Sequence, residues 1–153
     1  MEKSTFTITS DDTLTLFDRV LTDFADDDVS SVSFPNDAVM VKTGKNKNTI
    51  FAKDEKGNNA NLILRLIRGS SDDELLQSKI DQMEADFVST VLAEGEFVKR
   101  LGDGQGNVKR DVYTLLGGVI VRRVDGKENT SGDTAQGVAI YNMTFANARR
   151  SIQ

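Results

Sequence analysis

Three glycines at alternate positions make RLGDGQGNVKR, residues 100–110, the first stretch to test for ligand chemistry. A glycine-rich loop binds phosphate when it follows a strand and opens a helix, with G-x-G-x-x-G or G-K-[ST] spacing. Here the spacing is G-x-G-x-G, and the residues that follow, VKRDVYTLL, predict a strand. A calcium loop needs several acidic ligands, whereas Asp103 is the only acid within the turn.

The same stretch is better interpreted as a β-hairpin tip, in which the glycines supply positive φ angles. It connects two predicted strands, GEFVK and VYTLL. The tip residues are Gly102, Asp103, Gly104, Gln105, Gly106 and Asn107.

Two charge clusters also invite a chemical interpretation. Asp72 and Asp73 resemble a catalytic pair, but acidic residues are also favoured at the positive end of a helix. The basic stretch TGKNKN has three interpretations: a nucleic-acid contact, a solvated loop tip, or a loop that reaches an acidic patch on a neighbour. It comprises Thr43, Gly44, Lys45, Asn46, Lys47 and Asn48. Asp26, Asp27 and Asp28 are a candidate for such a patch.

Composition excludes several classes of enzyme. The chain has no histidine and no cysteine, so neither a Ser-His-Asp triad nor an imidazole or thiolate metal site can form. A hydrolase with two carboxylates stays formally open, although the sequence has no tryptophan to build a sugar platform. We therefore expect no enzyme activity, cofactor or metal. The formal net charge of −5 disfavours tight nucleic-acid binding, and no apolar run is long enough for a membrane anchor.

The elements that position these residues are mostly strands. Period-two alternation and turn-forming loops predict strands in the following segments: two short ones within 5–17 around SDD, then 29–34, 39–42, 49–53, 62–68, one from about residue 95, 112–124 and 137–148. The series from residue 39 to 68 reads as consecutive hairpins. In the last segment Ala139, Tyr141, Met143 and Phe145 share one face. Gly117 and Gly118 predict a bulge, a bend or a close backbone approach.

One segment has helical spacing instead. Leu76, Ile80, Met83 and Phe87 recur at intervals of three and four, and Ser71 precedes Glu74 as in a capping box. We expect a helix over about 71–86.

These elements predict a mainly β fold: an antiparallel β-sandwich or barrel with one flanking α-helix, in a single domain over residues 1–153. Segments 61–68 and 112–124 are apolar on both faces over part of their length. Antiparallel sheets normally leave one face in water, so the helix and a neighbouring copy of the chain are expected to cover the second face.

Four stretches together resemble the tail-tube proteins of long-tailed bacteriophages, in particular a tube family found beside the sheath protein in contractile-tailed phages. They are VSFPNDAVMVKTGKNKNTIFA, RLIRGSSDDELL, GEFVKRLGDGQGNV and GDTAQGVAIYNMTFANA. The resemblance runs from about Asp18 to Ala148.

The resemblance implies a structural virion protein without catalytic residues. Hexameric rings would stack into the inner tail tube, which houses the tape-measure protein and conducts DNA during ejection. Implied partners are other copies of the chain, the sheath protein if the tail is contractile, and the tube-initiating baseplate and tail-terminating proteins. The implied location is the virion tail, assembled in the host bacterial cytoplasm. The alternative is a hexameric inner-tube protein of a bacterial contractile injection or secretion apparatus.

The resemblance also implies roles for the two loops. The 42–53 hairpin with its Thr43–Asn48 loop becomes the leading candidate for a contact between rings. The Gly102–Asn107 tip becomes a compact turn at a ring edge, where a bulky tip would obstruct stacking.

Overall fold

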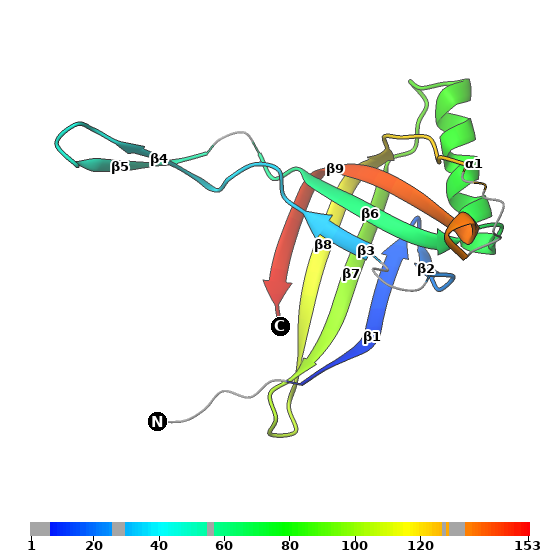
Figure 1. The fold of residues 1–153 in the computed structure, drawn as a ribbon, viewed down its shortest axis with the longest axis horizontal. Coiled ribbons are helices and arrows are strands. Elements are labelled where there is room, and N and C mark those ends of the chain that lie inside the picture. Colours follow the sequence, from blue (N-terminus) through cyan, green and yellow to red (C-terminus); the bar gives the residue numbers. More distant parts are fainter. Residues whose placement is uncertain (1–6, 26–29, 55–56, 127, 129–133) are drawn as a thin grey trace.

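A computed structural model of the chain describes residues 7–25, 30–54, 57–126, 128 and 134–153. Most of its elements are strands, and helix α1 lies at one end of them (Figure 1). The strands are β1 (Thr7–Leu16), β2 (Arg19–Leu21), β3 (Ser30–Ser33), β4 (Val39–Thr43), β5 (Thr49–Lys53), β6 (Ala60–Ile67), β7 (Ala93–Gly102), β8 (Val108–Ile120) and β9 (Val138–Ile152); the helices are α1 (Ser71–Ala85) and the short 3₁₀ helix η1 (Thr134–Gly137).

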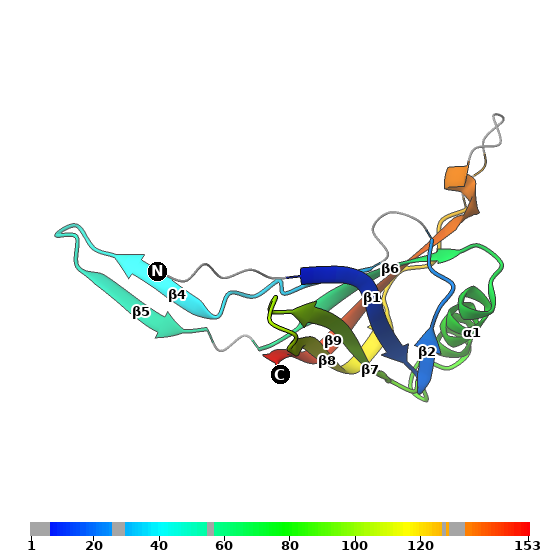
Figure 2. The same cartoon turned by 90° about the horizontal axis from the view of Figure 1, so that it is seen from below.

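Seven strands form one antiparallel sheet in the order β2-β1-β7-β8-β9-β6-β3, and β4 pairs only with β5. The large sheet curls into a half-barrel, with α1 at one end of the molecule and the β4–β5 hairpin extending from the other (Figures 1 and 2). The predicted mainly antiparallel β fold with one flanking helix is therefore confirmed.

The core lies on one face of this sheet. Leu62, Leu64 and Leu66 of β6 are fully buried and alternate with more exposed residues. They pair with the residues of β9 predicted to share a face: Met143 lies opposite Leu62, and Tyr141 opposite Leu64. Leu76 and Ile80 of α1 complete the cluster. Burial of one such side chain contributes about 2 kcal/mol, so this layer is the main source of stability.

Helix α1 matches the prediction within one residue at each end. The N-cap is Ser70, whose hydroxyl accepts a hydrogen bond from the Asp73 amide at 3.3 Å. The N-cap therefore lies one residue before the expected Ser71, and the reciprocal bond of a capping box is absent here: the Asp73 carboxylate accepts from the Gly69 amide at 2.8 Å, while the Ser70 amide donates to the Ile67 carbonyl. Asp72, Asp73 and Glu74 occupy the first turn, where their charge complements the helix dipole.

Two strand predictions need correction. The SDD triplet does not separate two strands: it lies in β1, where the register with β7 shifts between Ile8 and Asp12. The turn comes later, at Phe17 and Asp18, which adopt φ values of 51° and 60°. The hairpin series also ends early, because β6 pairs with β9 and β3 and not with β5. The expected patch at 26–28 lies outside the described residues.

The predicted irregularity in the glycine pair is real, although β8 begins and ends about four residues earlier than expected. The register of β7 with β8 shifts opposite this pair, and Gly117 has a φ of 66°. A Cβ on Gly118 would lie 2.3 Å from the ring of Phe145. Gly117 thus permits the bulge, and Gly118 leaves room for a buried aromatic ring.

Among the described residues, the helices are all too short or too polar to span a bilayer.

Candidate assembly surfaces

The β4–β5 hairpin, here called the arm (residues 38–54), stands apart from the sheet (Figures 1 and 2). Its strands pair from Val39 opposite Lys53 to Thr43 opposite Thr49. At its base the Asp54 amide donates to the Ala38 carbonyl at 3.0 Å. Near its tip the Thr43 and Thr49 hydroxyls lie 3.1 Å apart. Hydrogen bonds within the hairpin therefore hold its two strands together.

Both faces of the arm carry exposed apolar side chains. Val41 and Phe51 lie opposite each other on one face and are 60% and 70% exposed. Met40 and Ile50 lie on the other face and are also largely exposed. A folded monomer gains nothing by presenting such side chains to water, so the arm is the first candidate for a contact with another molecule.

The predicted contact loop, Thr43–Asn48, forms the tip of the arm. The Gly44 amide donates to the Asn48 carbonyl at 2.9 Å, and the Lys47 amide donates to Gly44 at 3.0 Å. Lys47 has a φ of 64°, a left-handed conformation usually taken by glycine or asparagine. The turn thus presents lysine at the extreme end of the arm in a conformation that costs about 1 kcal/mol.

The second predicted loop, Gly102–Asn107, is the turn between β7 and β8, as the glycine spacing indicated. Asp103 is its organising residue: Oδ1 accepts from the amides of Gln105 and Asn107, at 2.8 and 3.2 Å, and Oδ2 accepts from Asn107 Nδ2 at 2.8 Å. The bond from Asn107 and then that from Gln105 lower the pKa of the Asp103 carboxyl. Gly104 and Gly106 adopt φ values of 79° and 89°. The carboxylate is fully used within the turn, so a ligand is not needed to explain it.

The two loops are not brought together. The arm extends along the long axis of the molecule, whereas the β7–β8 turn projects across it, on the same side as β1 (Figure 1). They form two separate surfaces.

The half-barrel has an open edge at each end of its strand order. Strand β2 pairs with β1 only over Leu14–Leu16, and the rest of β1, from residue 7 to 13, has no strand on that side among the described residues. At the other end β3 pairs only with β6 over Asn61–Leu64. Open edges present unpaired backbone groups that a second chain can bind.

A further surface was missed by the sequence prediction, which identified no contact surface in residues 87–92, between the expected helix and the strand from about residue 95. The segment is instead an ordered turn with exposed apolar side chains: Phe87, Val88, Val91 and Leu92, of which Val88 is 95% exposed. Thr90 fixes it by donating from its amide and its hydroxyl to the Phe87 carbonyl, at 3.2 and 2.6 Å. The serine–threonine pair that ends the helical periodicity was the available signal.

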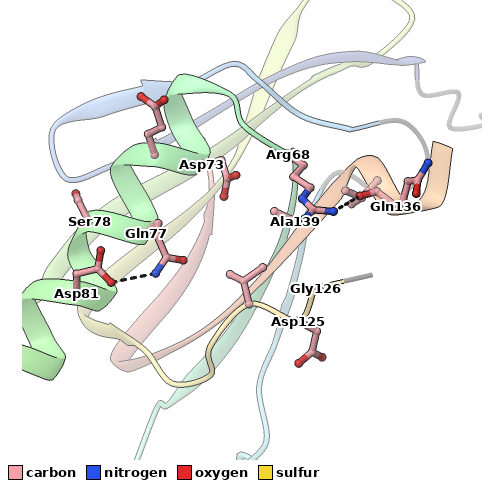
Figure 3. A pocket seen from close by; sticks show the side chains of 12 residues that line it. Arg68, Asp73, Gln77, Ser78, Asp81, Asp125, Gly126, Gln136 and Ala139 are labelled. Atoms are coloured by element: carbon pink, nitrogen blue, oxygen red, sulfur yellow. Dashed lines mark hydrogen bonds between the residues drawn. The ribbon is translucent and has the colours of Figure 1, made fainter. Parts of the chain in front are cut away.

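The acidic start of α1 borders a cavity of about 430 Å³ (Figure 3). Its polar groups already have partners: Gln77 donates to Asp81 at 3.1 Å, and Arg68 donates to the Gln136 carbonyl at 3.2 Å. Asp73 accepts from the Tyr141 hydroxyl. Burial, and then this hydrogen bond, raise the pKa of Tyr141. The described residues contain no group of three or more acidic side chains arranged to hold a metal ion.

The comparisons with known proteins support the fold. No family model and no curated protein matches the sequence. Among solved structures, the chain is similar to the tube-terminating cap of the anti-feeding prophage. The TM-score is 0.60 at 13% identity, and the match covers 96% of this chain and 91% of that one. The fold is therefore tail-tube-like. This likeness shows the architecture, while the arm, the two edges and the 87–92 turn are features of this chain itself.

Proposed function

We propose that this chain is a self-assembling structural subunit of a tail tube. Hexameric rings stack into a hollow conduit that first houses a tape-measure protein and then conducts DNA. The observation that carries the proposal is the arm: a two-stranded hairpin with apolar residues exposed on both faces. An isolated hairpin of this kind is marginally stable in water, so its order depends on a surface outside the monomer.

The open edges of the half-barrel support the same proposal. A ring in which the β1 edge of one subunit meets the β3 edge of the next would pair the backbone groups that the monomer leaves open. Repetition around a closed ring satisfies every subunit equally. Ring closure is thus assigned to the sheet edges, and stacking to the arm.

Charge supports a conduit for DNA. Each chain carries a formal net charge of −5, which is repeated in every subunit of an assembly. Like charge disfavours the counterion-releasing contacts by which proteins bind phosphate backbones, so a polyanion could move through the tube without adhering.

The remaining proposed partners follow from the resemblance: a sheath if the tail contracts, and baseplate and terminating proteins at the tube ends. The assembly would form in the host bacterial cytoplasm and function in the virion tail.

The test is the assembly state of the purified chain, measured by sedimentation and negative-stain electron microscopy over a range of concentrations. Rings and hollow tubes are expected. The variant Phe51→Asp, which places a charge in the middle of the arm, should keep its circular dichroism spectrum but lose the tubes. A wild-type chain that remains monomeric at high concentration would refute the proposal.

Two related functions compete with it. Likeness to a tube-terminating cap favours a subunit that ends a tube: such a chain would form single rings that bind the end of a tube and never stack on themselves. An inner tube of a bacterial contractile injection or secretion apparatus would stack in the same way as a phage tube. Microscopy separates the cap from both tubes, and labelling of intact phage tails with an antibody against the chain separates the phage tube from the bacterial apparatus.

A further inference from the structure

The molecule presents a second apolar surface besides the arm. We call it the α1 corner: the turn at residues 86–92 together with the C-terminal half of α1 beside it. Phe87 and Val91 are each 70% exposed, and a cavity of about 310 Å³ lies between the turn and the helix. Met83, Ala85 and Val91 contribute apolar atoms to its wall. The hydrogen bonds from Thr90 to Phe87 hold the turn in place, so this surface exists before any partner binds.

The arm and the α1 corner have opposite charge. Between residues 38 and 53 the arm contains no acidic residue and four lysines: Lys42, Lys45, Lys47 and Lys53. Helix α1 and the turn after it, residues 71–92, contain one lysine and six acids. Asp81, Glu84 and Asp86 lie in the α1 corner, and the other three begin the helix. Basic apolar and acidic apolar surfaces favour each other over a second copy of themselves.

Some of this charge is already used within the monomer. Asp72 is buried against Arg19, and Arg123 binds Glu84. Lys79, the one lysine of the helix, lies 4.9 Å from the centre of the Phe17 ring. Asp81 borders the other cavity, where it accepts from Gln77. Asp86 is exposed and lines the cavity beside the turn, together with Lys79. The surface around the cavity therefore keeps negative charge for a basic partner.

The two surfaces lie at opposite ends of the long axis of the molecule (Figures 1 and 2). One chain therefore cannot dock its own arm on its own corner. A contact between two such different surfaces is heterologous, and each added copy offers a new free arm and a new free corner. Such a contact can therefore repeat from copy to copy through an assembly.

We propose that the arm of one subunit docks on the α1 corner of a second copy, with Phe51 or Ile50 entering the cavity beside Val91 and the arm lysines facing Asp86. The inference rests on the proposed self-assembly and adds to it the surface that receives the arm. The chemistry of the partner is that of this chain itself.

The first test is the double variant Val88→Asp, Val91→Asp. Both side chains are largely exposed, so the monomer should keep its thermal unfolding midpoint while the tubes disappear. Ile152→Asp is the matched control, because Ile152 is 56% exposed at the far end of β9 and lies outside both surfaces. This control should form tubes as the wild type does. Normal tubes from the double variant would overturn the inference.

Cross-linking tests the pairing directly, because the wild-type chain has no cysteine. Phe51→Cys mixed with Val88→Cys should give a covalent dimer with a short bismaleimide. Phe51→Cys mixed with Ile152→Cys should give far less. Equal yields in the two mixtures, or none with Val88→Cys, would overturn the inference.

Charge is tested with Lys45→Gln, Lys47→Asn, since asparagine tolerates the left-handed turn at position 47. The concentration at which tubes appear should rise severalfold, and its dependence on salt should weaken. An unchanged threshold and salt dependence would contradict the charge pairing. A wild-type chain that never assembles refutes the proposed function and this inference together. Assembly that survives the corner variants refutes the inference alone.

Discussion

At the scale of single residues, a buried carboxylate fixes the helix to the start of the sheet. Asp72 is completely buried. Its Oδ2 accepts from the Thr22 and Asp23 amides at 2.7 and 2.9 Å, and its Oδ1 lies 3.0 Å from Arg19 Nη2. The first turn of α1 therefore holds the end of β2 and the residues after it. The acid that could be mistaken for a catalytic group at the sequence level is a structural one.

Replacement of Asp72 by alanine should lower the free energy of unfolding by about 3 kcal/mol, because two amide donors lose their acceptor. Urea denaturation followed by circular dichroism measures this. Glu74→Ala is the control: it removes an exposed acid from the same helical turn and should change stability by about 0.5 kcal/mol or less. Equal losses in both variants would mean that Asp72 acts only through the helix dipole.

A second residue-scale prediction concerns Gly118. Any side chain at this position must displace the buried ring of Phe145, whose Cε1 would lie 2.3 Å from the new Cβ. Gly118→Ala should therefore destabilise the fold by about 1–3 kcal/mol. Gly126→Ala, at a site with no atom within 4 Å, should be close to neutral. The measurement is the thermal unfolding midpoint of the two variants, which should be lower for Gly118→Ala. Equal midpoints would show that the sheet relaxes around the added methyl group.

At the scale of elements, local pattern determined what could be predicted from the sequence. The helix, the buried face of β9 and the two hairpin turns each depend on residues close in sequence, so periodicity and turn chemistry revealed them. The pairing of β6 with β9 joins residues 60–67 to 138–145, and no local signal encodes it. The left-handed turn at Phe17 and Asp18 was missed for a related reason: phenylalanine rarely adopts that conformation, and an aspartate, which adopts it more often, does not by itself mark a turn. Both faces of the arm are exposed because β5 does not pair with β6, and the sequence does not encode that absence locally.

The prediction at the scale of elements concerns the β7–β8 turn. Gln105 is exposed at the tip, between the two left-handed glycines. Gln105→Trp adds bulk without straining the positions that require glycine. If the tip lies at a ring edge, this variant should leave the unfolding midpoint of the monomer unchanged and shorten the tubes seen by microscopy. Gln105→Ser is the control and should assemble normally. Tubes of full length from the tryptophan variant would remove the tip from the stacking interface.

At the scale of the whole molecule, the core accounts for one face of the half-barrel, and the proposed assembly would cover what the monomer leaves exposed. The arm, the α1 corner and the two sheet edges lie on different sides of the subunit, so each can serve a different neighbour in a stacked ring. Sequence reasoning anticipated the need for neighbours from the surplus of apolar strand positions. It could not locate the contacts, because exposure depends on how the strands pair.

The net charge of the chain predicts how the assembled particle behaves toward DNA. An acidic subunit should build a particle that does not bind duplex DNA, since its net charge is negative and the arm lysines are proposed to face acidic residues of a neighbouring copy, where they cannot release counterions from the phosphate backbone. Fluorescence anisotropy of labelled DNA, titrated with assembled particles at low and at physiological salt, should show no saturable binding at either. A polylysine peptide in the same assay confirms that binding is detectable. Binding that weakens steeply as salt rises would reveal a concentrated basic surface, formed by the arms or elsewhere, and would argue against a conduit through which DNA moves freely.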